Sequence, residues 1–416
     1  QIVPPQDPRI RDEAEAAGPA KDIPRGRFQK AVADGRITIL DGRLDDAWLD
    51  ALETQCLGPV PPPVQVSVTT TALHGVGHLS IEAALTRRGF TEVHAVAAQA
   101  APDGEFPTVR FPNPEEPGAL DLALAVAREA DTDLVVANDP DADRLCVAVR
   151  DKASEGGYRV LTGNELGVLM ADWLLGERAR RKTLPDVPLV LTTIVSTSML
   201  GRMAEAYGAR SGEVLTGFKW IWDRALALEA EAKTTFLFGF EEALGYCVGP
   251  VVRDKDGVGA AMVAMELTAA LKADGKTLLD RLDALYRKHG LYLTKQIATV
   301  LPGSEGKAQI AATMSRLRAH APTEVAGVAV VRTRDLDGPD AETEGLPRSN
   351  VLTWWLKDDS RIVLRPSGTE PKLKVYLEVR RPVSGKGAKA MTTAQSKGQA
   401  RLEALSAWVR EVVTTG

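Results

Sequence analysis

Strand-like and helix-like patterns alternate along the first half of this sequence, and that alternation restricts the fold more than any other feature. Residues 64–71 are β-branched and apolar, residues 77–88 have helical spacing, and residues 93–98 again resemble a strand. A helical pattern at 119–130 and a short apolar run at 134–137 follow. Because parallel strands need crossover connections, usually helices, this order predicts a doubly wound α/β layer with a mainly parallel sheet.

The same rhythm starts again after the basic, proline-containing stretch at 178–188. Strand-like runs occupy 189–195 and 234–238, and helical patterns occupy 197–207, 218–232 and 258–271. We therefore expect two consecutive doubly wound α/β domains, at 62–185 and 188–290.

Beyond residue 291 the strands outnumber the helices. Strand-like runs lie at 295–300, 325–332, 351–357, 361–364 and 372–379, with two helical stretches among them. This pattern predicts a C-terminal α+β domain at 291–416, built on an antiparallel sheet. The Gly/Lys/Ala/Thr-rich segment 384–395 is expected to be a loop.

The N-terminal residues differ from the rest. Prolines and a glycine interrupt any helical period in residues 1–40, an amphipathic helix is expected at 44–57, and a proline-rich linker follows at 59–63.

Composition excludes several classes of function. The 416 residues suffice for two to four domains, and 51 Lys+Arg against 56 Asp+Glu leave a net charge of −5, which disfavours nucleic-acid binding. No apolar run approaches the ~20 residues that span a bilayer, and no signal peptide is evident, so we expect a cytoplasmic protein without a membrane partner. Cys56, Cys146 and Cys247 match neither a zinc site nor a disulfide framework.

The most informative local motif directly follows the apolar run at 134–137. Asp139, Asp141 and Asp143 alternate, with Arg144 beside them, and such carboxylates can converge on one hard divalent cation. An EF-hand does not fit, because it needs Gly and Glu where this loop has Arg144 and Arg150. An aspartate-nucleophile phosphatase motif and an acidic surface turn remain alternatives at this point.

A second motif separates two strands of the last domain. Arg365, Ser367, Gly368 and Thr369 offer a guanidinium, two hydroxyls and a glycine backbone within five residues, a combination suited to a phosphate dianion. A simple hairpin turn is the alternative.

Two weaker motifs lie in the second α/β domain. Glu241 and Glu242 follow a strand and are bracketed by glycines, which suits hydrogen bonding to sugar hydroxyls but equally suits a helix start. Lys219 and Lys255 are candidate phosphate or proton-transfer groups, or simply solvated charges. His74 sits in a His-Gly-Val-Gly turn, where a structural role is expected.

Taken together, these motifs resemble the α-D-phosphohexomutase superfamily, which includes phosphoglucomutases, phosphomannomutases and phosphopentomutase-like enzymes. The pieces occur in the order of that family: residues 74–77, 139–144, 216–219, 239–245 and 365–371. The resemblance implies domains arranged around a central cleft, with residues 1–57 as the C-terminal remnant of the family's first domain.

The resemblance also implies a role for each matching residue. Asp139, Asp141 and Asp143 would bind Mg²⁺, with Arg144 near the transferring phosphoryl group as the catalytic residue of this chain. Thr216, Gly217, Lys219, Glu241 and Lys255 would contact substrate. Arg365, Ser367, Gly368 and Thr369 would hold the phosphate that is not transferred. Ala243 occupies the place of a family serine, so one hydroxyl contact to the sugar is missing.

The family transfers phosphate through a phosphoserine next to a histidine, and this chain contains no Ser-His pair. We therefore expect the serine to lie upstream and this fragment to be inactive alone. The expected function is interconversion of sugar 1-phosphates with 6-phosphates or 5-phosphates through a sugar bisphosphate such as glucose 1,6-bisphosphate, by a monomer or homodimer. A non-catalytic sugar-phosphate binding protein is the alternative from another class.

Overall fold

The computed structural model describes residues 2–40, 42–301, 303–367 and 371–414. The chain forms two compact units. The first comprises residues 1–159, 217–238 and 245–270, and the second comprises residues 160–216, 239–244 and 271–416. The chain therefore passes back and forth between the units several times.

The first unit contains a five-stranded sheet of order β2-β1-β3-β4-β5. Its strands are β1 (Val68–Thr71), β2 (Val93–Ala95), β3 (Leu134–Ala137), β4 (Cys146–Arg150) and β5 (Tyr158–Val160). Strand β1 pairs in parallel with β2 and β3, whereas β4 is antiparallel to β3. Every residue of β1 and β3 is buried, as expected for central strands covered on both faces.

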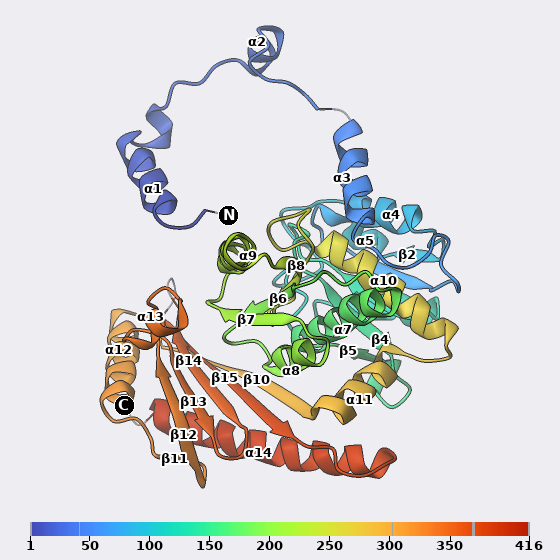
Figure 1. The fold of residues 1–416 in the computed structure, drawn as a ribbon. Helices are drawn as coiled ribbons and strands as arrows, with labels where there is room; N and C mark the ends of the chain where they lie inside the picture. Colours follow the sequence, from blue (N-terminus) through green and yellow to red (C-terminus); the bar gives the residue numbers. More distant parts are fainter. Residues whose placement is uncertain (1, 41, 302, 368–370, 415–416) are drawn as a thin grey trace. The chain divides into compact units, whose positions relative to one another are not determined.

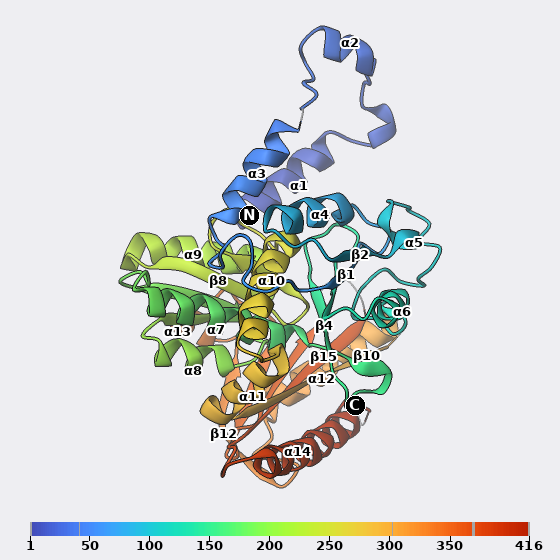
Figure 2. The same ribbon diagram turned by 90° about the vertical axis from the view of Figure 1, so that its right-hand side faces the viewer.

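Helices surround that sheet, and α6 packs against β1 and β3 (Figure 2). Besides two N-terminal helices described below, the helices of this unit are α3 (Arg43–Glu53), α4 (Gly77–Arg87), α5 (Ala97–Ala100), α6 (Asp121–Glu129), α9 (Phe218–Ala232) and α10 (Gly257–Ala273). The unit also includes 3₁₀ turns at Ala20–Asp22 and Glu155–Gly157 and strand β9 (Gly245–Val248). The expected alternation of strands and helices is thus confirmed, although β2 is shorter than predicted and α5 replaces its second half.

Two helices in residues 1–40 contradict the expectation that this segment lacks helical structure. They are α1 (Gln6–Ala16) and α2 (Phe28–Ala33), and neither contains a buried residue. In α1 the proline at position 8 lies in the first turn, where its missing N–H costs nothing, and a Glu/Ala/Arg-rich run follows. The expected breakers Gly18, Pro19 and Pro24 lie between the two helices, so they limit the helices without excluding helix from the whole segment.

The second unit begins with a helix that the sequence reading did not identify, α7 (Gly163–Arg181). Thr162 caps its N-terminus by accepting a hydrogen bond from the Glu165 backbone, and the Glu165 side chain returns a bond to the Thr162 N–H. This capping box is a sequence-readable start signal. The other elements near it are β6 (Pro188–Thr193), α8 (Met199–Ala206), β7 (Arg210–Val214) and α11 (Leu278–His289).

A four-stranded sheet has the order β7-β6-β8-β9, and β6 and β7 pair in parallel. The division between the units falls within β8 (Thr235–Glu241). Within the described residues no helix has both the length and the apolar character needed to cross a membrane.

The C-terminal part of the second unit is built on a six-stranded antiparallel sheet of order β10-β15-β14-β13-β12-β11 (Figure 1). Its strands are β10 (Leu291–Val300), β11 (Glu324–Val325), β12 (Val328–Asp335), β13 (Leu352–Leu356), β14 (Arg361–Pro366) and β15 (Lys372–Arg381), and its helices are α12 (Gly303–Ala319), α13 (Asp340–Glu344) and α14 (Ala388–Thr414). This confirms the predicted α+β domain.

Apolar and polar side chains alternate along β14 and β15, so the two faces of this sheet differ in character. Ile362, Leu364, Val375 and Leu377 share one apolar core with side chains of α12 and α14. The alternate residues of these strands, such as Arg361 and Arg365, face the other way, because side chains alternate along a strand.

The loop predicted at 384–395 is wrong for most of its length, because α14 begins at Ala388. Gly385 and Gly387 have positive φ angles and form the turn before the helix. Met391 and Ala394 are buried and start the three-to-four-residue spacing that continues to Leu402. The sequence reading overlooked this periodicity beneath the polar composition.

Candidate active site

Three aspartates converge in the loop that follows β3 in the first unit. One carboxylate oxygen from each of Asp139, Asp141 and Asp143 lies within 4.8 Å of the others. Asp139 is fully buried, Asp141 is exposed and Asp143 is intermediate. In the part of the chain that the structure describes, these residues are the group suited to hold a metal ion.

Short-range hydrogen bonds close this loop, which we call the Asp loop (residues 138–145). The Asn138 side-chain amide donates to the Arg144 carbonyl at 2.7 Å, and the Ala142 N–H donates to the Asp139 carbonyl at 2.9 Å. Ala142 has a left-handed φ of 59°, which turns the chain between Asp141 and Asp143.

Two glycines pack directly against the backbone of the Asp loop. A Cβ added at Gly75 would lie 2.2 Å from the Pro140 backbone, and one added at Gly257 would lie 2.4 Å from the Arg144 carbonyl oxygen. The Val76 N–H also donates to the Pro140 carbonyl at 2.9 Å. Glycine is therefore required at both positions by close approach.

The neighbouring His74 is buried rather than directed at the carboxylates. Its Nε2 lies 2.8 Å from the hydroxyl oxygen of Thr108. This contact supports the structural role that was expected for His74.

Basic groups partly neutralise the Asp loop. Asp139 accepts hydrogen bonds from the Arg144 backbone N–H at 3.0 Å and from its Nε, and Lys255 Nζ lies 2.8 Å from Asp143 Oδ2. Burial nevertheless raises the pKa of Asp139, and the charge of Asp141 adds to the rise. A divalent cation held by the three carboxylates would offset that cost, and oxygen ligands of this kind fit Mg²⁺.

The start of α9 holds three of the predicted substrate-binding residues, which are far from the Asp loop in the sequence: Thr216, Gly217 and Lys219. The Lys219 ammonium is 3.8 Å from Asp7 Oδ2 and 4.9 Å from the Trp220 ring centre. The Thr216 hydroxyl is buried, with no hydrogen-bond partner among the described residues. Gly217 has a φ of 121°, a conformation that favours glycine.

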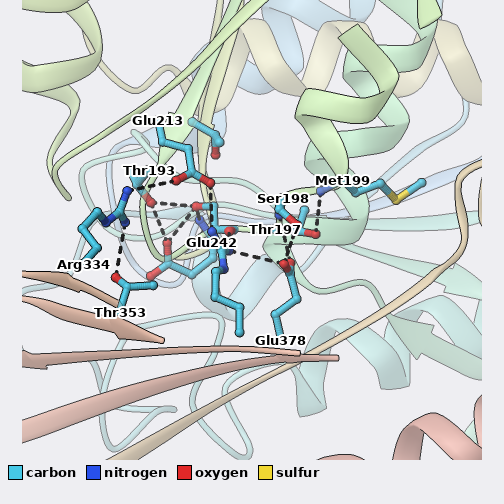
Figure 3. Close-up of polar contacts among 12 residues, drawn as sticks. Thr193, Thr197, Ser198, Met199, Glu213, Glu242, Arg334, Thr353 and Glu378 are labelled. Atoms are coloured by element: carbon cyan, nitrogen blue, oxygen red, sulfur yellow. Dashed lines mark hydrogen bonds and ion pairs between the residues drawn. The ribbon is translucent and has the colours of Figure 1, made fainter. Parts of the chain in front are cut away.

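Glu241 and Glu242 lie in the second unit, at the end of β8. Glu241 is buried, with only 8% exposed. Glu242 is held by two hydroxyls, since the Ser196 Oγ lies 3.0 Å and the Thr193 Oγ1 3.3 Å from its Oε2. Figure 3 shows Thr193 beside Glu242. Burial raises the pKa of Glu242, and these hydroxyls act against the rise.

Arg365 lies at the C-terminal end of β14, directly opposite Lys374 of β15. Like charges at directly opposite positions destabilise a sheet, and a bound anion would offset their repulsion. The Ser367 N–H donates to the Lys372 carbonyl at 2.7 Å. A cavity of about 200 Å³ beside α12 is lined by residues that include Lys307, Ile310, Ser367 and Lys372, and its lining does not include Arg365 or Lys374. Gly368 and Thr369 lie outside the described residues.

Tyr376 connects these two groups electrostatically. Burial raises its pKa, the charges of Glu242 and Glu241 contribute to the rise, and Arg365 opposes it. The carboxylates after β8 and the cation at the end of β14 therefore act on the same phenol.

The sequence reading did not identify four of these residues: Thr193, Ser196, Lys374 and Tyr376. The hydroxyl-rich end of the strand at 189–195 was the available signal for the first two, because polar residues at a strand end are typical of a binding edge.

Comparison with known proteins gives matches to three domain models of one family. The phosphoglucomutase/phosphomannomutase alpha/beta/alpha domain II model matches residues 46–154, the domain III model matches 162–289, and the C-terminal domain model matches 349–393. The boundary expected between 185 and 188 stays a prediction.

Curated relatives agree with these models. The chain is 39% identical over 383 residues to a probable phosphomannomutase of Haemophilus influenzae, which covers 91% of this chain and 72% of that protein. It is 36% identical to the human phosphopentomutase and 35% identical to a Staphylococcus haemolyticus phosphoglucomutase, of which it spans only 57% and 60%.

Solved structures show the same fold. A putative phosphomannomutase from Thermus thermophilus matches 87% of this chain, and 66% of its own chain is covered, with a TM-score of 0.59 at 20% identity. A family protein from Burkholderia thailandensis matches 91% of this chain and 69% of its own, with a TM-score of 0.58 at 16% identity. The chain belongs to the phosphoglucomutase/phosphomannomutase family.

Proposed function

We propose that this protein is a phosphosugar mutase that interconverts sugar 1-phosphates with 6-phosphates or 5-phosphates through a phosphoserine and a sugar bisphosphate. The observation that carries the proposal is the convergence of Asp139, Asp141 and Asp143 within 4.8 Å in a member of this family. Relatives named phosphomannomutase, phosphopentomutase and phosphoglucomutase support the reaction class.

The Asp loop is assigned to the transferring phosphoryl group. Bound there, Mg²⁺ would supply charge stabilisation, which phosphoryl transfer chiefly requires. The Arg144 side chain, anchored on Asp139 Oδ2, adds a fixed positive charge beside the carboxylates. Lys255, anchored on Asp143, adds a second.

The second unit is assigned to the sugar and to the phosphate that is not transferred. Glu241 accepts hydrogen bonds from sugar hydroxyls. The Thr216 hydroxyl is buried with no partner among the described residues, so it can pair with the substrate only after a local rearrangement exposes it. Arg365, Lys374 and Ser367 bind the phosphate, because a cation pair opposite one another favours a dianion.

A phosphorus NMR assay on protein purified from its source tests this function. We expect conversion of glucose 1-phosphate to the 6-phosphate, dependent on Mg²⁺ and abolished by EDTA. Asp141→Asn should raise the Mg²⁺ concentration that gives half-maximal conversion by about tenfold or more, because it removes one charged ligand. Asp103→Asn, a change at an exposed carboxylate outside the Asp loop, is the matched control.

Three results would contradict the proposal. Release of inorganic phosphate without isomerisation indicates a phosphatase. Binding of the sugar phosphate without turnover indicates a binding protein. Conversion that is unaffected by EDTA removes the metal assignment.

A further inference from the structure

Ser196 lies in the turn between β6 and α8 and is fully buried. It contacts groups from separate parts of the second unit: Thr193 in β6, Glu242 after β8 and Arg361 in β14. Figure 3 shows Thr193 and Glu242 close together, with Glu213, Ser198 and Glu378 in the same polar cluster.

The hydroxyl of Ser196 fixes Glu242 at two points. The Glu242 backbone N–H donates to Ser196 Oγ at 3.0 Å, and Ser196 Oγ lies 3.0 Å from Glu242 Oε2 and 2.7 Å from Thr193 Oγ1. A hydroxyl has one hydrogen and two lone pairs. If Ser196 donates to the carboxylate, it accepts from the backbone N–H and from Thr193, so all its bonding capacity is used. The single hydrogen of Thr193 is then shared between Ser196 Oγ and Glu242 Oε2.

The carbonyl of Ser196 holds the other side of the cluster, because it accepts a hydrogen bond from Arg361 Nη2. Arg361 is 4% exposed, and its Nη1 donates to Glu213 Oε1 at 2.8 Å. Nearby, Ser198 donates to Glu378 through its backbone N–H at 2.9 Å and its hydroxyl at 2.6 Å. The same turn therefore fixes residues of both β14 and β15.

The register of β14 and β15 links the residues held by the Ser196 turn to Arg365 and Lys374 at the other end of the same two strands. Arg361 is opposite Glu378, and Arg365 is opposite Lys374. All four side chains lie on one face of the sheet because they are separated by even numbers of residues. Arg365 is about 13 Å along the strand from Arg361, at ~3.3 Å per residue.

From this arrangement we infer that Ser196 is a positioning residue that fixes the Glu241–Glu242 pair relative to the strand bearing Arg365. It thereby sets the spacing between the groups that bind the sugar and the groups that bind the phosphate. This inference rests on the proposed function, and Ser196 itself does not touch substrate.

The Ser196→Ala variant tests the inference by calorimetric titration with glucose 1,6-bisphosphate and, separately, with inorganic phosphate. We expect bisphosphate affinity to fall about tenfold, the usual effect of one lost hydrogen bond to a charged group. Phosphate affinity should stay within about twofold, because the Ser196 carbonyl and its bond to Arg361 remain.

Ser406→Ala is the matched control for damage to the fold. Ser406 is also a buried serine in the second unit, and its hydroxyl donates to the Leu402 carbonyl at 2.7 Å within α14. It should leave both affinities unchanged.

The pH dependence of bisphosphate binding provides a second readout, which a general destabilisation of the fold would not change. The charged or titratable groups that influence Glu242 are Lys374 and Tyr376 of β15, besides the Ser196 and Thr193 hydroxyls. The Ser196 hydroxyl stabilises the ionised carboxylate, so its removal should raise the pKa of Glu242 further. As the pH is lowered, Glu242 should therefore become protonated at a higher pH in Ser196→Ala than in the wild type, and bisphosphate affinity should begin to fall at that higher pH. The titration of the phosphate groups is common to both proteins.

The possible failures are distinguishable. If the wild type binds no sugar phosphate, both the proposed function and this inference are wrong. If the wild type binds but Ser196→Ala behaves as Ser406→Ala in affinity and pH dependence, the inference alone is wrong. Equal losses of bisphosphate and phosphate affinity would also contradict it, because they indicate damage to the whole cluster.

Discussion

The Asp loop of the first unit and the polar cluster around Ser196 in the second unit are built in opposite ways. We call the latter the Ser196 cluster; it comprises Thr193, Ser196, Ser198, Glu213, Glu242, Arg361 and Glu378. Consecutive residues supply the Asp loop, and two glycines allow neighbouring backbone to approach it closely. The Ser196 cluster instead gathers side chains from distant segments, since Ser196, Glu242, Arg361 and Glu378 meet only in the folded unit. Chemistry that is contiguous in sequence can be read directly, whereas distributed chemistry depends on the fold.

The energetics of the two regions should differ as well. The Asp loop depends on shape, because an added methyl group would collide with backbone. The Ser196 cluster depends on charge, because Arg361 is buried beside Glu213 and Glu378. Among the described residues, removing it would leave Glu378 with only its hydrogen bonds from Ser198, and Glu213 with only the more distant Arg334.

The largest effect is expected for Arg361→Ala. Breaking a buried ion pair by removing one partner typically costs about 3–5 kcal/mol, so the free energy of unfolding should fall by that amount in urea denaturation. Arg332→Ala is the control in the same sheet, because Arg332 pairs with Glu344 but is 58% exposed. Its loss should cost less than about 1 kcal/mol.

If Arg361→Ala and Arg332→Ala cost the same, the Ser196 cluster contributes no more than a surface ion pair. The contrast between a charge-built and a shape-built region would then be lost.

A smaller effect is expected for Gly75→Ala in the Asp loop. The added Cβ must displace the Pro140 backbone, and overpacking of this kind typically costs about 1–3 kcal/mol. Gly104→Ala is the control, because no atom lies within 4 Å of a Cβ built there, and it should change the stability by less than about 0.5 kcal/mol. The same thermal unfolding experiment measures both.

Displacement of Pro140 should also weaken metal binding, since that residue lies between Asp139 and Asp141. A Gly75→Ala protein that keeps its stability and its metal affinity would show that close approach does not shape the Asp loop.

Much of the fold could be predicted from the sequence. The run at 134–137 became β3 at its expected bounds, and the helix expected at 218–232 became α9. These segments combine strong periodicity with clear ends. The prediction failed where composition concealed periodicity, as at the start of α14, and where a capping box was overlooked before α7.

The candidate site also contains one part that the sequence predicted and one part that it did not. The Asp loop was identified from consecutive residues, and the structure brings its three carboxylates together. The contacts of Ser196 with Glu242 and Arg361 join residues 46 and 165 positions apart in the chain. No local pattern specifies such pairs, because tertiary packing alone creates them.

A crystal structure of the protein with Mn²⁺ and glucose 1,6-bisphosphate tests the central claim most directly. We expect an anomalous Mn²⁺ peak coordinated by Asp139, Asp141 and Asp143, and a phosphate group bound by Arg365 and Lys374. A Mn²⁺ peak away from the three aspartates, or a phosphate that avoids the end of β14, would contradict it.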